Sequence, residues 1–118
     1  VHLQTDGDLM YAPGALWTAA HSRIPLLMVM HNNRAYHQEV MHIQRMANRH
    51  QRAIKDTARI GTTLVDPNID FAKIAQGMGW YAEGPIADPK DLAPAIRRAI
   101  AAVKRGEPAL LDTVTQPR

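Results

Sequence analysis

The sequence predicts an α/β fold, with a mainly parallel sheet flanked by helices. The run over residues 24–30 is apolar throughout and too short for a typical helix, which fits a strand buried on both faces. Strand-like and helix-like segments alternate along the chain, as they do in parallel sheets. The length of 118 residues, with 46% apolar and 21% charged residues, is that of one globular domain.

The N-terminal part is expected to supply two strands and one helix. Residues 1–5 have strand character, and residues 6–14 are predicted as a loop because glycine and proline interrupt them. Residues 15–22 are helix-compatible and mostly apolar, and the buried strand over residues 24–30 follows.

The middle of the chain is expected to hold two helices and two short extended pieces. Residues 38–54 carry apolar side chains at helical spacing, with a polar outer face and Ile54 as the last apolar position. Residues 61–66 are predicted as a short extended piece. A turn at residues 66–68 then leads into a helix that Gly77 and Gly79 end, and residues 80–86 form a strand.

The last helix has the clearest boundaries. Asp91 is predicted as its N-cap, which places Pro94 in the first turn, where a missing N–H costs little. Gly106 and Pro108 stop the helix, and residues 109–115 form the closing strand. The expected apolar stripe consists of Leu92, Ile96, Ile100 and Val103.

The composition limits where the protein works. The chain begins with strand character at once, so we expect it to be part of a larger protein, truncated near the N-terminus. It has no cysteine, hence no disulfide or thiolate metal site, and no apolar run of the ~20 residues that a membrane span needs. We therefore expect a cytoplasmic protein that does not bind membranes.

Positive charge is concentrated in one segment, between residues 34 and 59. This segment is either a solvated helix face or a surface that takes anionic substrates or another subunit. Nucleic acid is not expected as a partner, because aromatic residues make up only 5% of the chain and do not alternate with the basic residues. The basic side chains are Arg34, Arg45, Arg49, Arg52, Lys55 and Arg59.

Two short polar motifs follow two neighbouring predicted strands. Asp6-Gly7 follows the first strand and Asn32-Asn33 follows the second, with 24 residues between the motifs. Ligands of open α/β sheets bind at the carboxyl ends of strands, so the motifs belong to the same edge. One carboxylate, one amide oxygen and one backbone carbonyl suit Mg²⁺, and a nearby helix N-terminus suits a phosphate.

These motifs resemble the signature of the thiamine-diphosphate-dependent enzymes, which is Gly-Asp-Gly, some two dozen residues and then Asn-Asn. Residues 15–20 resemble a helix of benzoylformate decarboxylases, and residues 69–75 and 107–111 resemble acetolactate synthases and 2-oxo acid decarboxylases. The resemblance implies that residues 1–118 form the C-terminal pyrophosphate-binding domain of a longer chain, with the thiamin-diphosphate-binding fold.

The resemblance also implies a role for each site residue. Asp6, Asn33 and the backbone carbonyl of Ala35 would bind Mg²⁺, which would bridge to the diphosphate of thiamine diphosphate. Gly7 and the backbone N–H of Asp8 would contact the diphosphate directly. FAD is not indicated.

The sequence departs from the signature at two positions. Thr5 stands in place of the first glycine, and a β-branched residue does not adopt a positive φ, so the turn must begin at Asp6. Asp8 stands where relatives often carry a small hydroxyl. A carboxylate ~4 Å from a diphosphate charge is repelled by ~4 kcal/mol at an effective dielectric of 20, so Asp8 must point away, be offset by the metal or weaken binding.

The implied activity is that of a lyase or transferase which makes or breaks a carbon–carbon bond next to the carbonyl of a 2-oxo acid. A decarboxylase and an acetolactate-synthase-like carboligase are equal candidates. The glutamate that activates the cofactor would lie on a missing N-terminal pyrimidine-binding domain of the same or a partner subunit, in a homodimer or homotetramer. Within this chain, His37 is the candidate acid/base.

Two other functions remain open on the sequence. Asp6 and Asp8 form an Asp-x-Asp pair that a Mg²⁺-dependent phosphoryl-transfer enzyme would use. Alternatively, the basic segment makes a non-catalytic interaction module, whose binding would weaken with salt and ignore magnesium.

Overall fold

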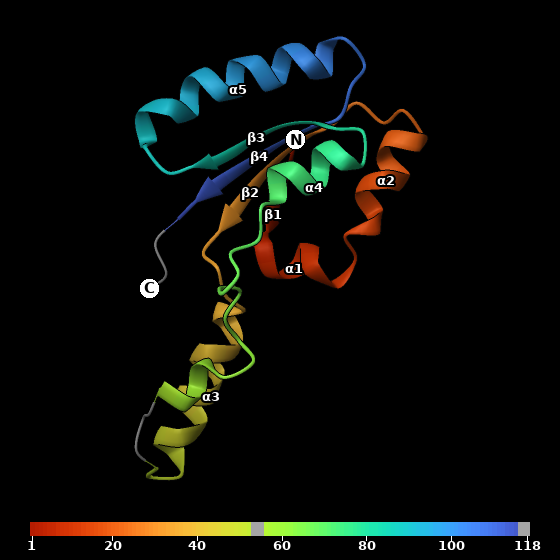
Figure 1. The fold of residues 1–118 in the computed structure, drawn as a ribbon. Coiled ribbons are helices and arrows are strands. Elements are labelled where there is room, and N and C mark those ends of the chain that lie inside the picture. Colours follow the sequence, from red (N-terminus) through yellow and green to blue (C-terminus); the bar gives the residue numbers. More distant parts are fainter. Residues whose placement is uncertain (53–55, 116–118) are drawn as a thin grey trace.

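The computed structural model describes residues 1–52 and 56–115 and confirms the α/β fold with a parallel sheet (Figure 1). Along the chain the elements are β1 (His2–Thr5), α1 (Asp6–Tyr11), α2 (Gly14–His21), β2 (Leu27–Asn32), α3 (His37–Arg49), the 3₁₀ helix η1 (Asp56–Arg59), α4 (Phe71–Gly77), β3 (Tyr81–Ile86), α5 (Pro89–Lys104) and β4 (Ala109–Val114). No described helix is long and apolar enough to cross a membrane.

The sheet has the strand order β1-β2-β4-β3, and every neighbouring pair is parallel. Strand β4, last in the chain, therefore lies between β2 and β3. The register pairs Thr5 with His31 and Asn32 with Val114, so β1, β2 and β4 end along the same edge.

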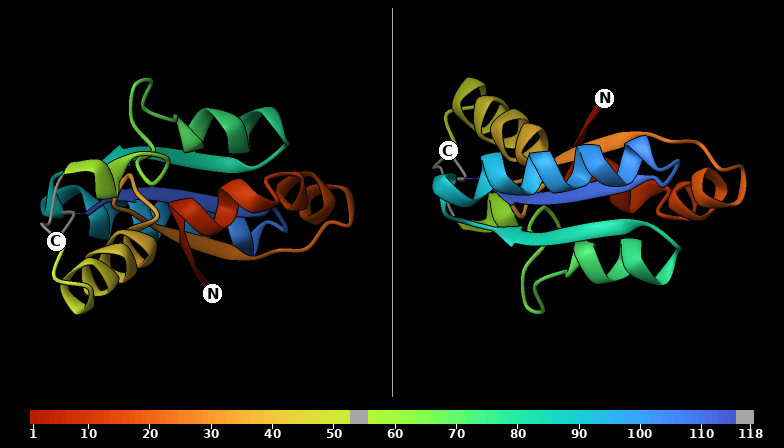
Figure 2. Two further views of the ribbon diagram at one scale, coloured as in Figure 1. Left: turned by 90° about the horizontal axis from the view of Figure 1, so that it is seen from below. Right: turned by 90° about the horizontal axis from the view of Figure 1, so that it is seen from above.

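Helices cover both faces of the sheet, and each face has its own core. Helices α1, α2 and α4 pack on one face around Phe71, Met30 and Leu110, which are all buried. Helix α5 packs on the other face, where it lies over β4 in the view from above (Figure 2). Its buried side chains are three alanines, Ala95, Ala99 and Ala102, which bring the helix close to Leu27 and Leu111.

Helix α3 and η1 project from the carboxyl edge of the sheet and pack mainly on each other (Figure 1). We call this projection the arm, residues 37–52 and 56–61. The chain enters the arm through Arg34–Tyr36 and leaves it through Thr62–Leu64. These segments are joined by an isolated antiparallel bridge between Ala35 and Thr63.

The prediction of a loop over residues 6–14 was wrong for its first half. Residues Asp6–Tyr11 form α1 directly after β1, and Thr5 is the N-cap, with Oγ1 accepting from the Asp8 N–H at 3.3 Å. Thr5 has an extended backbone, with φ −93° and ψ 153°, which a β-branched residue adopts readily. The threonine that departs from the signature therefore starts a helix.

Three element boundaries also differ from the sequence prediction. Strand β2 begins at Leu27 rather than residue 24, and α3 ends at Arg49, so the predicted apolar contact of Ile54 lies outside the described residues. Residues 61–66 contribute only the single bridge at Thr63, and η1 was not predicted.

The start of α5 was placed too late. Its N-cap is Asp88, whose carboxylate accepts from the Lys90 N–H at 2.9 Å, and Pro89 takes the first helical position. Pro94 therefore lies inside the helix. The fully buried stripe of the helix is the alanine row. Of the predicted stripe, Ile96 and Val103 pack half-buried against that core, while Ile100 remains 40% exposed.

Candidate functional site

The two polar motifs lie at one edge of the sheet, as the parallel arrangement predicted. Asp6 follows β1 and Asn33 follows β2, and these strands are neighbours in register. Among the described residues there is no cluster of three or more His, Cys, Asp or Glu side chains arranged to hold a metal. Any cation bound here would therefore need amide, backbone or ligand oxygens besides a carboxylate.

Asp6 is a buried carboxylate without a partner. Its side chain is 0% exposed, and neither Oδ1 nor Oδ2 has a hydrogen bond within the described part of the chain. Burying an ionised carboxylate unpaired costs several kcal/mol, and buried polar groups in proteins are almost always satisfied. Such a side chain fits a cation that neutralises it.

Gly7 lies directly beneath the ring of Tyr36. A Cβ at position 7 would lie 2.8 Å from Tyr36 Cδ1, well inside van der Waals contact, so only glycine allows this approach. The Tyr36 ring also packs on Tyr11, with centroids 5.5 Å apart. An aromatic side chain thus covers the glycine for which the sequence predicted contact with a diphosphate.

Asp8 points away from Asp6. Its side chain is exposed whereas Asp6 is fully buried, as expected for residues two apart on a helix. The two carboxylates do not share a pocket, which disfavours the phosphoryl-transfer alternative. The Asp8 N–H, expected to contact a diphosphate, donates instead to Thr5 Oγ1.

The loop after β2 is organised by two consecutive side-chain turns. Asn32 Oδ1 accepts from the Arg34 N–H at 3.1 Å, and Asn33 Oδ1 accepts from the Ala35 N–H at 3.0 Å. Between them Arg34 adopts a φ of +60°, a left-handed conformation that costs an arginine about 1–2 kcal/mol.

The bridge to residues 62–64 determines where the carbonyl of Ala35 points. Tyr36 N donates to Thr62 O, and Leu64 N donates to Arg34 O, both at 2.8 Å. In an antiparallel ladder the N–H and C=O of the residue between these bonds face the other way. The Ala35 carbonyl is thus directed away from Thr62–Leu64, and within the described residues it accepts no backbone hydrogen bond.

A second buried carboxylate, Asp112 on β4, lies on the same face of the sheet. It is 0% exposed, and its Oδ1 accepts from Asn32 Nδ2 at 2.8 Å, while Oδ2 has no partner in the described part of the chain. Burial raises the pKa of Asp112, and the hydrogen bond from Asn32 opposes that rise. The nearby charges of Asp70 and Asp6 raise the pKa further.

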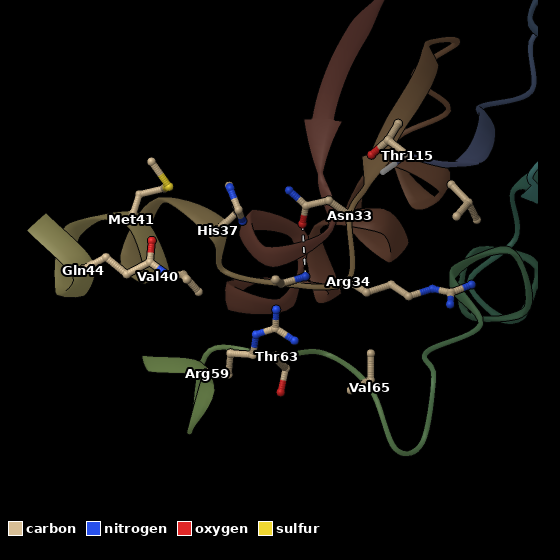
Figure 3. A pocket seen from close by; sticks show the side chains of 12 residues that line it. Asn33, Arg34, His37, Val40, Met41, Gln44, Arg59, Thr63, Val65 and Thr115 are labelled. Carbon is tan, nitrogen blue, oxygen red and sulfur yellow. Dashed lines mark hydrogen bonds between the residues drawn. The ribbon is translucent and has the colours of Figure 1, made fainter. Parts of the chain in front are cut away.

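A cavity of about 370 Å³ opens beside the Asn33–Ala35 loop, between α3, the segment after η1 and the end of β4 (Figure 3). His37, the first residue of α3, lines it together with Arg34 and Arg59. Among residues 1–52 and 56–115, no acidic side chain lines the cavity. The dashed line in Figure 3 marks the bond that places Asn33 at its mouth.

The described basic residues between positions 34 and 59 are all exposed, but they divide into two groups. Arg34 and Arg59 line the cavity, whereas Arg45, Arg49 and Arg52 lie along the arm outside the cavity lining. Lys55 lies outside the described residues.

Sequence reasoning missed Asp112 as part of this region, and it did not place Tyr36 over Gly7 or Arg59 in the cavity wall. The sequence does contain a signal for Asp112. A single charge directly after the apolar run Ala109–Leu111, in a strand expected to be buried, indicates a buried carboxylate. The positions of Tyr36 and Arg59 depend on how the arm returns to the sheet, which no local pattern specifies.

Comparison with known proteins adds independent findings. Residues 1–113 match the family described as thiamine pyrophosphate enzyme, C-terminal TPP binding domain. A Mycobacterium tuberculosis protein with the provisional name acetolactate synthase large subunit IlvX is 33% identical over 115 residues. The match covers 95% of this chain and 21% of that protein, so the chain spans about a fifth of this curated relative.

Solved structures show the same fold. The thiamine diphosphate-dependent 4-hydroxybenzoylformate decarboxylase of Rhodococcus jostii matches with a TM-score of 0.68 and 27% identity, over 97% of this chain and 19% of that one. The benzoylformate decarboxylase of Polynucleobacter necessarius matches with a TM-score of 0.67 over 98% of this chain and 19% of its own. At 14% identity, the second match speaks for the fold alone.

Proposed function

The chain belongs to the thiamine pyrophosphate enzymes as their C-terminal cofactor-binding domain, and from this premise we propose that it binds Mg²⁺ and the diphosphate of thiamine diphosphate at the edge formed by β1 and β2. The enzyme it serves makes or breaks a carbon–carbon bond next to the carbonyl of a 2-oxo acid. Residues 1–118 form one domain of a longer chain.

One observation carries this proposal: the fully buried carboxylate of Asp6, with both oxygens unpaired among the described residues. A divalent cation would neutralise it and supply the missing partners, which no described side chain does. Asp6 is a hard oxygen ligand of the kind that Mg²⁺ prefers.

Asn33 and Ala35 would complete the protein's share of the ligands. The Ala35 carbonyl is already directed away from the bridge that holds its neighbours. Asn33 Oδ1 keeps a second lone pair beside the one that the Ala35 N–H occupies. Two or three protein oxygens suffice, since Mg²⁺ usually takes its other ligands from water and phosphate.

The diphosphate would approach the start of α1 at Gly7 and the N–H of Asp8. In this structure both are occupied, the first by the Tyr36 ring and the second by the Thr5 hydroxyl. Binding there would therefore require Tyr36 to move and the long 3.3 Å cap bond to be exchanged. When bound, the cofactor would supply an electron sink that stabilises negative charge at the carbonyl carbon of the 2-oxo acid.

The cavity beside the loop is the proposed place for the 2-oxo acid. Arg34 and Arg59 line it without an opposing acid, so it favours a carboxylate. His37 lies in the same wall, where an imidazole can give or take a proton at the substrate oxygen.

The glutamate that activates the cofactor would come from a pyrimidine-binding domain of the same or a partner subunit, in a homodimer or homotetramer. The glutamates of this chain are used elsewhere or lie away from the edge. Glu83 pairs with Arg98 at 2.6 Å, Glu107 pairs with Arg105 at 3.0 Å, and Glu39 is exposed on α3.

Titration calorimetry of thiamine diphosphate into the full-length protein tests the proposal. Binding should require Mg²⁺, disappear with a chelator, and weaken in Asp6→Asn by more than about 100-fold, because removing a group that merely supports a metal ligand already costs about 10–100-fold. Asp8→Asn makes the same chemical change at an exposed position and should bind normally.

No binding by the wild-type protein would overturn the proposal. If Asp8→Asn abolished function while Asn33→Ala left it intact, the phosphoryl-transfer alternative would replace it. Assays with pyruvate and with benzoylformate would then separate the two reaction types: a decarboxylase releases CO₂ and the matching aldehyde, whereas a carboligase joins two pyruvates into acetolactate and releases one CO₂. Arg59→Gln should raise KM more than it lowers kcat.

A further inference from the structure

We infer that Asp112 is a positioning residue for the metal-binding loop: it orients the amide of Asn32, and through Asn32 it sets the backbone that carries Asn33 and Ala35. This inference rests on the proposed function for its metal, but the contacts that support it involve other residues.

The first step is the orientation of the Asn32 amide. Asn32 is 4% exposed, and its Nδ2 donates to Asp112 Oδ1 at 2.8 Å. A carboxylate only accepts hydrogen bonds, so it selects the amide nitrogen and excludes the oxygen. The acceptor at position 112 thereby fixes one of the two orientations that the amide could adopt.

The second step follows from that orientation. With Nδ2 turned to Asp112, Oδ1 is left to accept from the Arg34 N–H, as observed at 3.1 Å. A flipped amide would place its NH₂ group against that N–H, donor against donor. The bond helps to hold Arg34 at its positive φ, and this turn sends the chain into the bridge with Thr63.

The third step links the turn to the proposed ligands. Arg34 lies between Asn33 and Ala35, so its conformation decides where the Asn33 amide and the Ala35 carbonyl point. The bond from the Ala35 N–H to Asn33 Oδ1 forms only in this arrangement of the loop. Loss of the acceptor at Asp112 on β4 would therefore misplace Asn33 and Ala35, two proposed ligands that Asp112 does not contact.

The surroundings of Asp112 show that it is held firmly. A Cβ built on Gly84 of β3 would lie 2.6 Å from the Asp112 Cβ, so the two strands meet closely at this point. Burying a carboxylate costs free energy that an apolar side chain would not. Its hydrogen bond to Asn32, rather than packing, therefore accounts for a carboxylate at this position.

The test compares Asp112→Leu with Asp112→Asn in the full-length protein. Leucine removes the acceptor, whereas an asparagine carbonyl can still accept from Asn32 Nδ2. The first readout is hydrogen exchange at the Arg34 and Ala35 amides without metal or cofactor. The second is the Mg²⁺ affinity of the cofactor-loaded protein, and the third is the Tm without metal.

The inference expects faster exchange at both amides and Mg²⁺ affinity weakened about 10–100-fold in Asp112→Leu, with a lowered Tm because the buried Asn32 Nδ2 loses its acceptor. Asp112→Asn should stay near wild type in all three. Unchanged exchange and affinity in Asp112→Leu would overturn the inference. Equal losses in both variants would also overturn it, because the acceptor would then not be the cause.

Two further variants keep the test decisive. If Asp112→Leu does not fold, Asn32→Ala replaces it, and the inference then requires weaker Mg²⁺ binding in Asn32→Ala beside normal binding in Asp112→Asn. Asp6→Asn separates this inference from the proposed function. It should abolish metal binding while leaving exchange at the Arg34 amide unchanged, so a failure of the metal site and a failure of the positioning role give different results.

Discussion

The contact between Gly7 and the Tyr36 ring predicts that Gly7→Ala destabilises the wild-type protein but stabilises a variant that lacks the ring. In the wild-type background, Gly7→Ala places a methyl group 2.8 Å from Tyr36 Cδ1 and 3.0 Å from Cε1. Carbon atoms prefer about 3.5–4.0 Å, so the ring must move by roughly 0.7 Å or more. Overpacking of this kind costs about 1–3 kcal/mol.

The same substitution should stabilise the protein once the ring is gone. Gly7 lies within α1, where alanine is favoured over glycine by about 0.5–1 kcal/mol. In a Tyr36→Ala background, Gly7→Ala should therefore raise the free energy of unfolding by that amount. The coupling between the two positions comes to about 1–3 kcal/mol, the cost of the clash alone, because the helix term is the same in both backgrounds and cancels.

These four proteins, the wild type, Gly7→Ala, Tyr36→Ala and the double variant, form a double-mutant cycle. Urea unfolding followed by tryptophan fluorescence measures the free energy of unfolding of each. Gly77→Ala is the matched control, since Gly77 is the last residue of α4 and a Cβ there meets nothing within 4 Å. Equal effects of Gly7→Ala in both backgrounds would refute the assignment of Gly7 to the Tyr36 contact. The control should show no coupling to Tyr36.

The cycle also separates two reasons for a glycine at position 7. If the proposed diphosphate contact needs the same space, the double variant Gly7→Ala, Tyr36→Ala should recover stability without recovering affinity for thiamine diphosphate. If affinity returned as well, only the ring would require the glycine.

Three further predictions concern other parts of the molecule. Thr5→Ala should destabilise the protein by about 0.5–1 kcal/mol in urea unfolding, because it removes the N-cap of α1, while Thr5→Ser should retain most of it. Arg34→Gly should be more stable than Arg34→Ala by about 1 kcal/mol in thermal unfolding, since glycine adopts a φ of +60° without strain; equal stabilities would contradict that backbone conformation. The guanidinium of Arg98 lowers the pKa of Glu83 below its ordinary value of 4.5, so the pair stabilises the fold above that pH. Arg98→Ala should then be less stable than the wild type at pH 7, and the difference should vanish as the pH falls through the lowered pKa; a difference that persisted at low pH would count against it.

The fold class could be predicted because buried parallel strands leave a strong sequence signal. The run at residues 27–30 is apolar on both faces, and the alternation of elements left few other architectures. The strand order was not predictable, because β4 inserts between β2 and β3 through long-range pairing. The start of α1 was missed because Gly7 suggested a turn, whereas the hydroxyl of Thr5 caps a helix there.

The site was predictable in part for a related reason. Asp6 and Asn33 could be placed at one edge since each directly follows a strand of a parallel pair. The roles of Tyr36 and Asp112 could not, because each depends on a residue far away in the sequence. The unpaired state of Asp6 also appears only when its surroundings are known. The resemblance to a family suggested ligands, but it did not show how Asn32 supports them.

The bridge between Ala35 and Thr63 joins the arm to the sheet at the proposed metal ligands, so a change in the direction of the arm would also move these ligands. The arm contacts the rest of the domain little, so its direction is set mainly by the two short segments that this bridge joins. The Ala35 carbonyl lies between the two hydrogen bonds that join these segments, so a contact that tilts α3 would also turn this carbonyl. Thermodynamic linkage is reciprocal, so anything that changes metal affinity by reorienting the arm must itself bind more or less tightly, by the same factor, when the metal is bound.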